Sequence, residues 1–403
     1  MASPGEQGEP RIGMNVRAAR RSRGMSLDTL AGLTGHSKSW LSKVENGHLR
    51  LERRRDIAAL ADALSVSADT LMGVPAPGIR PGEVVYDVTP LQRALLDTSP
   101  DDPPDIPARP VAVLRAAVTD ADNALRDADH QAVVRLLAPA IAELCVVAAT
   151  GGEPDRSEAL RTLIVACGSD ATCALRQIGE PDLAWVAGER AREAAGLLGD
   201  PAWTAAAAFG RAHARASANR PRALMITPRL ADEADRDAGD DLFALQATGM
   251  LRLSAALARA VDGDHRGAAD QAAEAALIAA RTGEQAGSWE LFGPANVGVW
   301  QTSLAVEAGE AEAALTFAGQ VEPRDLASHN RRAGLRLEKA RAYAMLSKDT
   351  DAVREMRHAE RLSPAQTRND PMIRELVSGM LGRARREAGG RDLRGLAWRM
   401  NLI

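Results

Sequence analysis

The sequence predicts an all-α protein in which a small N-terminal domain precedes a long array of paired helices. Aromatic residues make up only 3% of the chain, so residues that favour strands are scarce, while alanine, the best helix former, is abundant. Clusters of Gly, Pro and Asp interrupt the apolar pattern at intervals expected of helix ends. The chain has 403 residues, which exceeds one ordinary hydrophobic core, so we expect two or three domains.

The first domain, residues 11–74, is predicted to form five short helices. Ser26 is placed to cap the second helix, and Gly35 supplies a tight turn after it. Ser37 is placed to cap a third helix over residues 38–45. The spacing therefore predicts two helices joined by a short turn at the centre of this domain.

This domain is basic although the whole chain is acidic. Within residues 11–74, eleven Lys and Arg stand against six Asp and Glu, a charge of +5, whereas the full chain carries −4. A basic module on an acidic body favours nucleic-acid binding at that end of the chain.

The run RSRGMSLDTLAGLTGHSKSWLSKVENG, followed by IAALADALSVSADTLMG, resembles the Xre-type helix-turn-helix domain of phage repressors and bacterial regulators. The resemblance covers about 60 of the 403 residues. It implies a five-helix, lambda-repressor-like fold whose third helix lies in the major groove of double-stranded DNA. It also implies a homodimer, because one such domain covers only half of a near-palindromic site.

The resemblance assigns roles to particular residues. Those expected to contact DNA are Lys38, Ser39, Ser42, Lys43, Asn46, Arg50 and Arg53. Lys38, Ser39 and Lys43 would read base edges, while the last three residues would contact phosphate or the minor groove. Arg20 and Glu45 would form an internal ion pair with a structural role. Trp40 is either close to DNA or half-buried against the second helix, and the run that continues at Arg54 and Arg55 is either a DNA contact or a solvated helix face.

Nine prolines between residues 75 and 110 predict a linker with one short helix at 91–96. Beyond it we expect helix pairs at 111–128 with 130–149, 155–177 with 181–198, 201–217 with 221–238, 241–261 with 266–281, 288–308 with 310–321, 329–346 with 349–361, and 371–388 with 391–400. The stretches 306–323 and 335–364 resemble tetratricopeptide repeats, which makes residues 111–403 a helical repeat solenoid. The alternative is an irregular helical bundle.

A ligand site is predicted around residues 285–305, where aromatic residues gather in an aromatic-poor chain. The candidate ligand-binding residues are Trp289, Phe292, Asn296 and Trp300, with Trp203, Phe209 and His213 on an earlier helix as further candidates. Asn296 and Trp300 share a helix face that is predicted to line the concave groove of the solenoid. In the other interpretation the tryptophans fill the core and Asn296 caps a break at Gly293-Pro294. This segment resembles one found in actinobacterial regulators that join an Xre domain to tetratricopeptide-like repeats.

The sequence also limits the function. It contains no phosphate-binding G-x-x-x-x-G-K-[ST] motif, no dinucleotide motif and no spaced metal ligands, so we expect neither an enzyme nor a cofactor or metal site. We see no secretory leader and no apolar stretch near 18 residues, which predicts a cytoplasmic, nucleoid-associated protein without a membrane contact. The three cysteines, Cys145, Cys167 and Cys173, are interpreted as buried thiols, with a redox switch as the alternative.

Two functional hypotheses follow. In the first, the chain is a transcription regulator whose repeat domain senses a small molecule or peptide. Its domain order resembles that of the peptide quorum-sensing regulators of Gram-positive bacteria. In the second, it is an adaptor whose repeat groove binds a partner protein, while the first domain recruits that partner to DNA.

Overall fold

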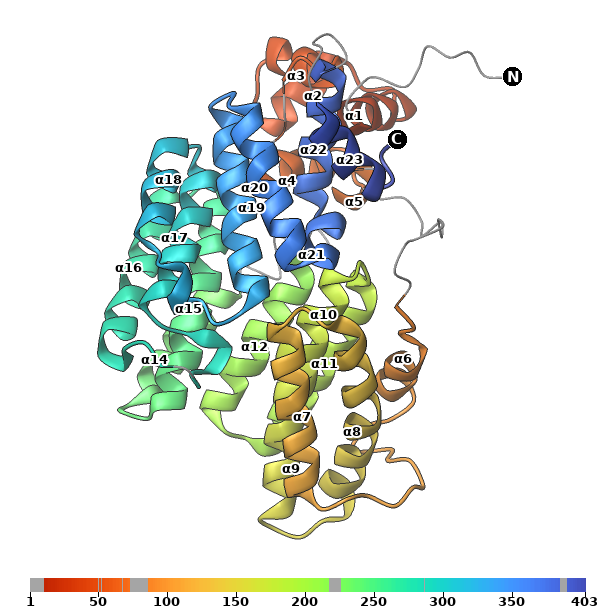
Figure 1. Ribbon diagram of the computed structural model, residues 1–403, viewed down its shortest axis with the longest axis vertical. Coiled ribbons are helices and arrows are strands. Elements are labelled where there is room, and N and C mark those ends of the chain that lie inside the picture. Colours follow the sequence, from red (N-terminus) through yellow and green to blue (C-terminus); the bar gives the residue numbers. More distant parts are fainter. Residues whose placement is uncertain are drawn as a thin grey trace.

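The computed structural model describes residues 11–49, 51, 53–66, 68–72, 86–216, 226–285, 287–384 and 390–403. Over these ranges every regular element is a helix, which confirms the predicted all-α class (Figure 1). The pair α7 and α8 lies at the bottom of Figure 1, α14 to α18 form the left side, and the N-terminal domain lies at the top.

The N-terminal domain consists of the five predicted helices, α1 (Arg11–Ser22), α2 (Leu27–Thr34), α3 (Lys38–Glu45), α4 (Arg54–Ala63) and α5 (Ala68–Met72). Ser26 caps α2 by accepting a hydrogen bond from the Thr29 amide, and Ser37 caps α3 through the Trp40 amide. Gly35 ends α2 at φ +69°, a left-handed conformation that favours glycine. Leu30, Leu41 and Leu60 are fully buried in the core of this domain.

The remaining helices are α6 (Thr89–Leu96), α7 (Val111–Arg126), α8 (His130–Thr150), α9 (Asp155–Ile164), η1 (Val165–Ala171), α10 (Thr172–Gln177), α11 (Pro181–Leu198), α12 (Pro201–Ala216), α14 (Thr227–Ala238), α15 (Leu242–Asp262), α16 (His265–Thr282), η2 (Trp289–Leu291), α17 (Pro294–Ala308), α18 (Ala311–Gln320), η3 (Pro323–Asp325), α19 (His329–Met345), α20 (Asp349–Leu362), α21 (Pro364–Asn369), α22 (Pro371–Ala384) and α23 (Arg391–Arg399). Most bounds agree with the predicted pairs. The predicted helix ends at residues 217 and 388 and the predicted start at 221 lie outside the described residues.

Three elements differ from the predicted pairs. The segment 155–177 is continuous but contains a π-helical turn, η1, at its centre. Helix α21 was not anticipated by the pair pattern. The predicted helix 288–308 is broken between η2 and α17, at the Gly293-Pro294 step that the sequence marks as a break, and Pro294 opens α17.

The described part of the predicted linker belongs to the repeat domain. Leu91 and Leu95 of α6 are fully buried against the core that contains α8. Arg190 Nε of α11 also donates to the Leu95 carbonyl at 2.8 Å. The prolines limit helix to one short piece, as predicted, but the apolar side chains of that piece anchor residues 86–110 on the array.

Helices that lie far apart in the sequence are in contact within the array. At the start of α19, Asn330 Nδ2 donates to the Leu125 carbonyl at the end of α7, at 2.5 Å. At the end of α21, Asn369 Nδ2 donates to the Gln177 carbonyl at the end of α10, at 3.0 Å. These bonds join segments about 200 residues apart, and Asn330 lies in the lining of the cavity described below.

The expectation that no apolar stretch approaches 18 residues is wrong for α8. This helix is long and apolar enough to cross a membrane, with a mean hydropathy of 2.0 over 18 residues. However, 56% of that window is buried within the protein, where α8 packs against α6, α7 and α9. A helix that is apolar on most sides is expected in the core of a large domain.

The N-terminal domain is packed against the repeat domain. The Arg54 amide and Nη1, at the start of α4, both donate to the Glu307 carboxylate near the end of α17, each at 2.9 Å. On the other side, Met372 of α22 contributes to the core of the N-terminal domain. The two domains therefore share both an ion pair and an apolar contact.

Candidate DNA-binding surface and repeat-domain cavity

Helix α3 presents a polar face to solvent. Lys38, Ser39 and Lys43 are exposed, and Ser42 is half-buried. Asn46, which follows the helix, is exposed and donates to Ser42 Oγ at 3.3 Å. The opposite face carries the buried Leu41 and Val44, so the amphipathic pattern fixes which side chains point outward. Arg50, also predicted to contact DNA, lies outside the described residues.

Lys38 has one intramolecular partner. Its Nζ lies 2.8 Å from Asp28 Oδ2 of α2, with the two side chains 60% and 67% exposed. Exposed ion pairs contribute about 1 kcal/mol or less, so this contact can exchange for another acceptor at little cost.

Arg20 and Glu45 form the predicted internal ion pair. Arg20 Nε and Nη2 donate to the two Glu45 oxygens at 2.6 and 2.8 Å, and Nη1 donates to the Met25 carbonyl at 2.7 Å. The hydrogen bond to Glu45 raises the pKa of Arg20 above its ordinary value. Both residues are buried, so the pair ties α1 to the end of α3 and fixes the angle of the exposed face.

Trp40 is half-buried, as one of the two interpretations held. Its ring stacks on His36, in the turn before α3, with centroids 3.6 Å apart and planes 7° from parallel. His36 Nε2 in turn lies 3.4 Å from Asp56 Oδ1 of α4. Trp40 therefore braces the turn between α2 and α3.

Residues 11–72, which span α1 to α5, match the family model of a helix-turn-helix domain. The N-terminal domain is a helix-turn-helix domain. Domains of this kind bind DNA through the helix that follows the turn, which here is α3. No curated protein matches the chain.

The run Arg53, Arg54 and Arg55 faces the repeat domain rather than solvent alone. A Cβ atom on Gly309 would collide with the Arg53 guanidinium, and one on Gly263 would collide with that of Arg55. Both glycines end helices in the left-handed conformation, which suits the absence of a side chain. In this arrangement Arg53 contributes to the contact between the domains, and its predicted contact with DNA stays a prediction.

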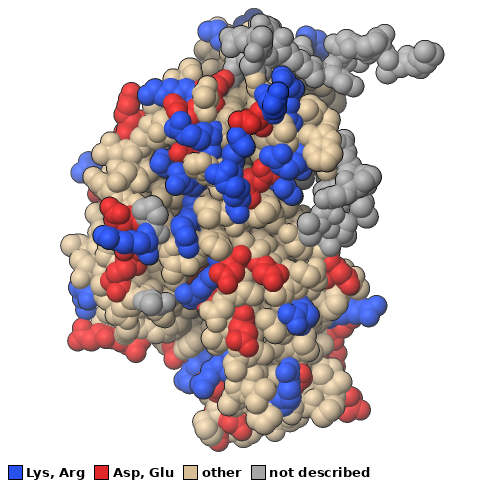
Figure 2. All heavy atoms as spheres, viewed as in Figure 1, with Lys and Arg blue, Asp and Glu red and all other residues tan. Residues whose placement is uncertain are grey.

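Arginines also gather over α19 and α20, on the upper half of the face in Figure 2, close to the helix-turn-helix domain. Several of these side chains are paired, since Arg336 and Lys339 contact Glu355, Arg354 contacts Asp351, and Arg357 contacts Asp392. Paired charges of this kind are typical of a solvated helix face. The arginines over α19 and α20 therefore give no reason to extend the candidate DNA-binding surface onto these helices.

The repeat domain contains a partly open cavity of about 760 Å³, lined by residues of α7, α9, η1, α10, α12, α15, η2, α17, α19 and α21. Of the predicted ligand-binding residues, Trp203, His213 and Trp289 line it, and Phe209 does so as well. The volume lies within the range of about 300–1,000 Å³ typical of small-molecule sites.

Phe292, Asn296 and Trp300 do not line the cavity, which corrects their placement in the ligand site. Phe292 is fully buried against Gly249, where a Cβ atom would collide with its ring. Trp300 is 7% exposed and packs behind the wall, its ring 5.3 Å from that of His213. Phe292 and Trp300 belong to the main hydrophobic core of the repeat domain.

Asn296 helps to hold the strained backbone of Glu290 and Leu291, two residues that line the cavity. Its Nδ2 donates to the Glu290 carbonyl at 3.2 Å, and Arg331 Nη2 donates to the same carbonyl at 3.2 Å. Glu290 and Leu291 have φ of +52° and +55°, a conformation that costs roughly 1–3 kcal/mol per non-glycine residue. Backbone strain of this kind often accompanies a binding site.

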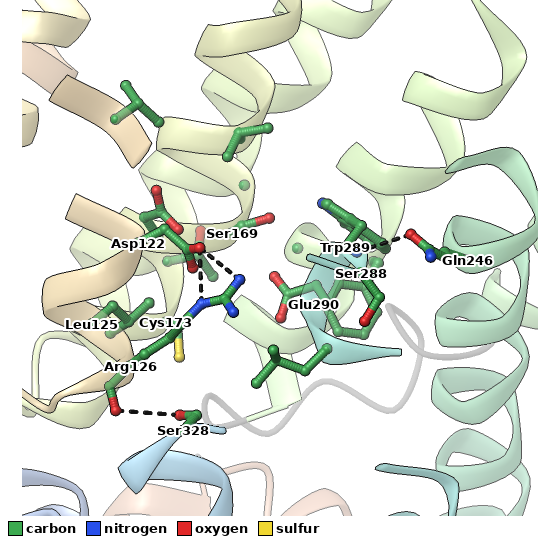
Figure 3. A pocket seen from close by; sticks show the side chains of 18 of the residues that line it. Asp122, Leu125, Arg126, Ser169, Cys173, Gln246, Ser288, Trp289, Glu290 and Ser328 are labelled. Atoms are coloured by element: carbon green, nitrogen blue, oxygen red, sulfur yellow. Dashed lines mark hydrogen bonds and ion pairs between the residues drawn. The ribbon is translucent and has the colours of Figure 1, made fainter. Parts of the chain in front are cut away.

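Aromatic rings form one wall of the cavity. The Phe243 ring lies 4.3 Å from that of Trp203 and 5.9 Å from that of Trp289. Gln246 Oε1 accepts a hydrogen bond from the Trp289 amide at 2.9 Å and so fixes η2 on α15 (Figure 3). Phe243 and Gln246 were not predicted from the sequence, because nothing in their own segment distinguishes them from ordinary core positions.

His213 is held as a neutral imidazole in this wall. Burial lowers its pKa well below the usual value, and the nearby Arg176 and Arg331 act in the same direction. Arg176 Nη1 lies 3.3 Å from Nδ1, which must therefore accept, so the ring proton resides on Nε2 and points to Ser254 Oγ at 3.1 Å. The neutral ring of His213 thus links Arg176 to Ser254 of α15 through hydrogen bonds.

Charged side chains on the other walls are mostly paired. Asp122 Oδ2 contacts Arg126 at 2.7 Å, and the Arg126 side chain extends toward Glu290 across the cavity (Figure 3). Glu290 is held by Arg331 at 3.0 Å. Arg115 contacts Glu158 at 2.9 Å. The cavity is thus polar on the α7 side and aromatic on the α12 and α15 side.

The three cysteines carry free thiols. Burial raises the pKa of Cys145, Cys167 and Cys173, which keeps each thiol protonated and weakly nucleophilic. Cys173 lines the cavity, where its sulfur accepts a hydrogen bond from Gln177. These environments fit the interpretation as buried thiols.

Proposed function

We propose that this chain is a transcription regulator of the Xre type that binds double-stranded DNA as a homodimer and senses a small molecule in its repeat domain. The observation that supports DNA binding most directly is the exposed polar face of α3 within a helix-turn-helix domain. The proposal places the protein in the cytoplasm, on the nucleoid, and assigns it no catalytic step.

The sensing part of the proposal is supported by the position of two helices. Helix α15 contributes Gln246 to the cavity lining, contacts the lining residue His213 through Ser254, and is followed by Gly263, beside Arg55. Helix α17 holds the segment around Glu290 through Asn296 and holds Arg54 through Glu307. A ligand that shifts either helix would also shift the helix-turn-helix domain, and with it the geometry of a DNA-bound dimer.

The adaptor hypothesis is the second candidate. The bonds from Asn330 and Asn369 bring α19 and α21 onto the ends of α7 and α10, while the cavity stays partly open. A cavity of about 760 Å³ is suited to a small molecule.

The first experiment is affinity selection of sheared genomic DNA with the full-length protein at about 150 mM salt, where phosphate contacts alone bind weakly. An inverted repeat near a few promoters is the expected result. Diffuse, salt-sensitive enrichment in both the presence and absence of cell extract would argue against a sequence-specific regulator. Analytical ultracentrifugation of the same protein, alone and with the selected site, tests the homodimer.

Lys43→Ala is expected to lower affinity for the selected site by about 1–3 kcal/mol, because it removes a charged contact to a base edge. The matched control is Arg156→Ala, which removes one exposed charge on α9, at the opposite end of the molecule (Figure 1). If both variants bind like the wild type, or both weaken equally, the assignment of the reading face to α3 is wrong.

A further inference from the structure

Asp170 is a buried carboxyl group that lines the cavity without a partner. It belongs to η1, the π-helical turn between α9 and α10, and its side chain is 2% exposed. Its Oδ2 makes no hydrogen bond with any described residue. Because buried polar groups in native proteins are nearly always hydrogen-bonded, an orphaned carboxyl in a cavity wall is a candidate contact for a bound molecule. π-Helical turns are also frequent at functional sites.

The other carboxylates of the cavity are already engaged. Asp122 pairs with Arg126, Glu158 with Arg115, and Glu290 with Arg331. Asp241 caps α15 by accepting from the Ala244 amide. Among the described lining residues, Asp170 is the carboxyl with neither a cation nor a backbone amide.

The lining arginines offer little to an anion. Arg115, Arg126, Arg161 and Arg331 each contact a carboxylate. Arg176 donates instead to Nδ1 and the carbonyl of His213, at 3.3 and 3.1 Å. An anionic ligand would have to compete with the groups that these arginines already contact. A cationic ligand would meet no such competition at Asp170.

Asp170 lies near two other carboxylates and one guanidinium group. Burial raises its pKa well above the ordinary value, the carboxylates of Asp122 and Glu290 act in the same direction, and Arg126 opposes them. A cation bound beside it would reverse this effect by stabilising the ionised carboxylate. The opposite wall offers Trp203, Phe243 and Trp289, whose rings suit an apolar or aromatic body.

Trp289 adds a second orphaned group. Its Nε1 is buried and donates to no described residue. An indole N–H normally finds an acceptor when it is buried. A ligand that carries one acceptor close to its ring system would satisfy it.

We propose that the cavity binds a small molecule with a protonated amine on an apolar or aromatic body, and that the ammonium group is held by Asp170. This inference rests on the sensing part of the proposed function and names the chemical class of its effector. The aromatic wall of Trp203, Phe243 and Trp289 would hold the body of the molecule, and Trp289 Nε1 would donate to its acceptor.

The test is a panel of matched fragments in three charge forms, measured with the full-length protein by ligand-observed NMR and calorimetry. The cations are tryptamine and 2-phenylethylamine, the anions indole-3-propionate and 3-phenylpropionate, and the neutral compounds 3-methylindole and ethylbenzene. We expect binding to concentrate in the cations. Asp170→Asn should weaken the binding of those cations about tenfold or more, the effect of losing a charged hydrogen bond.

Glu193→Gln is the control variant, because it removes a carboxylate of a half-buried ion pair on α11, away from the cavity lining. It should leave cation binding unchanged. Asp170→Leu provides a second readout, since the thermal midpoint of the unliganded protein should not fall when an unpaired buried carboxyl is replaced by an apolar side chain. Equal binding of the three charge forms, no binding of any fragment at millimolar concentration, or a lowered midpoint for Asp170→Leu would overturn the proposal.

The result is separable from the test of DNA binding. Asp170→Asn should select the same DNA site as the wild type when no fragment is present. If the wild type selects no DNA sequence but binds amines through Asp170, the regulator function fails and the amine site stands. If the wild type selects a DNA site but binds no amine, the amine site fails and the regulator function stands.

Discussion

Glu307→Gln should destabilise the protein, because Glu307 is the buried anion that joins the two domains. Its side chain is 0% exposed and accepts three hydrogen bonds, from the Arg54 amide, Arg54 Nη1 and Arg341 Nη2, each at 2.9 Å. Burial by itself would raise the pKa of Glu307, but the guanidinium groups of Arg341 and Arg54 outweigh it and hold the pKa below its ordinary value.

The size of the loss in unfolding free energy depends on how far Arg341 and Arg54 are still compensated by another carboxylate or by water. Removing one member of a buried ion pair costs about 3–5 kcal/mol. Arg341 keeps Glu338 at 2.7 Å after the substitution. The Arg54 side chain is 31% exposed, so water screens part of its contribution. Both effects place the expected loss near the lower limit, at about 3 kcal/mol of unfolding free energy.

The assay is urea unfolding followed by circular dichroism, with native-state hydrogen exchange of the Arg54 amide. Faster exchange at Arg54 is expected in the variant, since its amide loses an anionic acceptor. The matched control is Glu233→Gln, which removes an exposed i,i+4 pair with Arg229 and should cost about 0.3–0.5 kcal/mol. A Glu307→Gln variant no less stable than this control would refute the reasoning.

Three further predictions concern stability. Arg20→Met should lower the unfolding free energy by about 3–5 kcal/mol, because it leaves Glu45 buried and unpaired. The variant should also lose binding to the selected DNA. Normal DNA affinity in a folded variant would contradict this prediction. Gly249→Ala should cost about 1–3 kcal/mol and alter tryptophan fluorescence, because its Cβ would collide with Phe292 beneath η2. The stabilisation from Glu307, whose folded-state pKa is lowered, should be complete above its unfolded pKa of about 4.3 and lost as the pH falls through the lower folded value. Unfolding measured from pH 3 to 7 should therefore depend less on pH in Glu307→Gln than in the wild type.

Local signals predicted the helix-turn-helix domain well. Ser26 and Ser37 each satisfy an amide within their own helix, so their capping depends on only a few neighbouring residues. Gly35 is required by a left-handed turn that its own backbone defines. The Arg20–Glu45 contact spans 25 residues, and only the resemblance to a known domain made it predictable.

In the repeat domain, local sequence signals did not predict which side chains line the cavity and which fill the core. The spacing of Asn296 and Trp300 predicts that they share a face, and they do lie behind the same wall. Periodicity does not show which neighbouring helix covers that face. The sequence therefore did not distinguish burial in the core from exposure to the groove. Asp170 carried no signal either, because an isolated Asp within an apolar run resembles any exposed helix position.

The sequence by itself determined the helices, their caps, the basic N-terminal domain and the exposed polar face of α3, because these depend on residues close together in the chain. Only the tertiary structure decided that α19 and α21 meet the ends of α7 and α10 through Asn330 and Asn369, that Arg53 turns toward Gly309, and that Asp170 is left without a partner inside a cavity. Each of these results depends on contacts between residues far apart in the sequence. Such contacts are set by how the helices pack against one another, which the order of apolar and polar residues along a single helix does not specify.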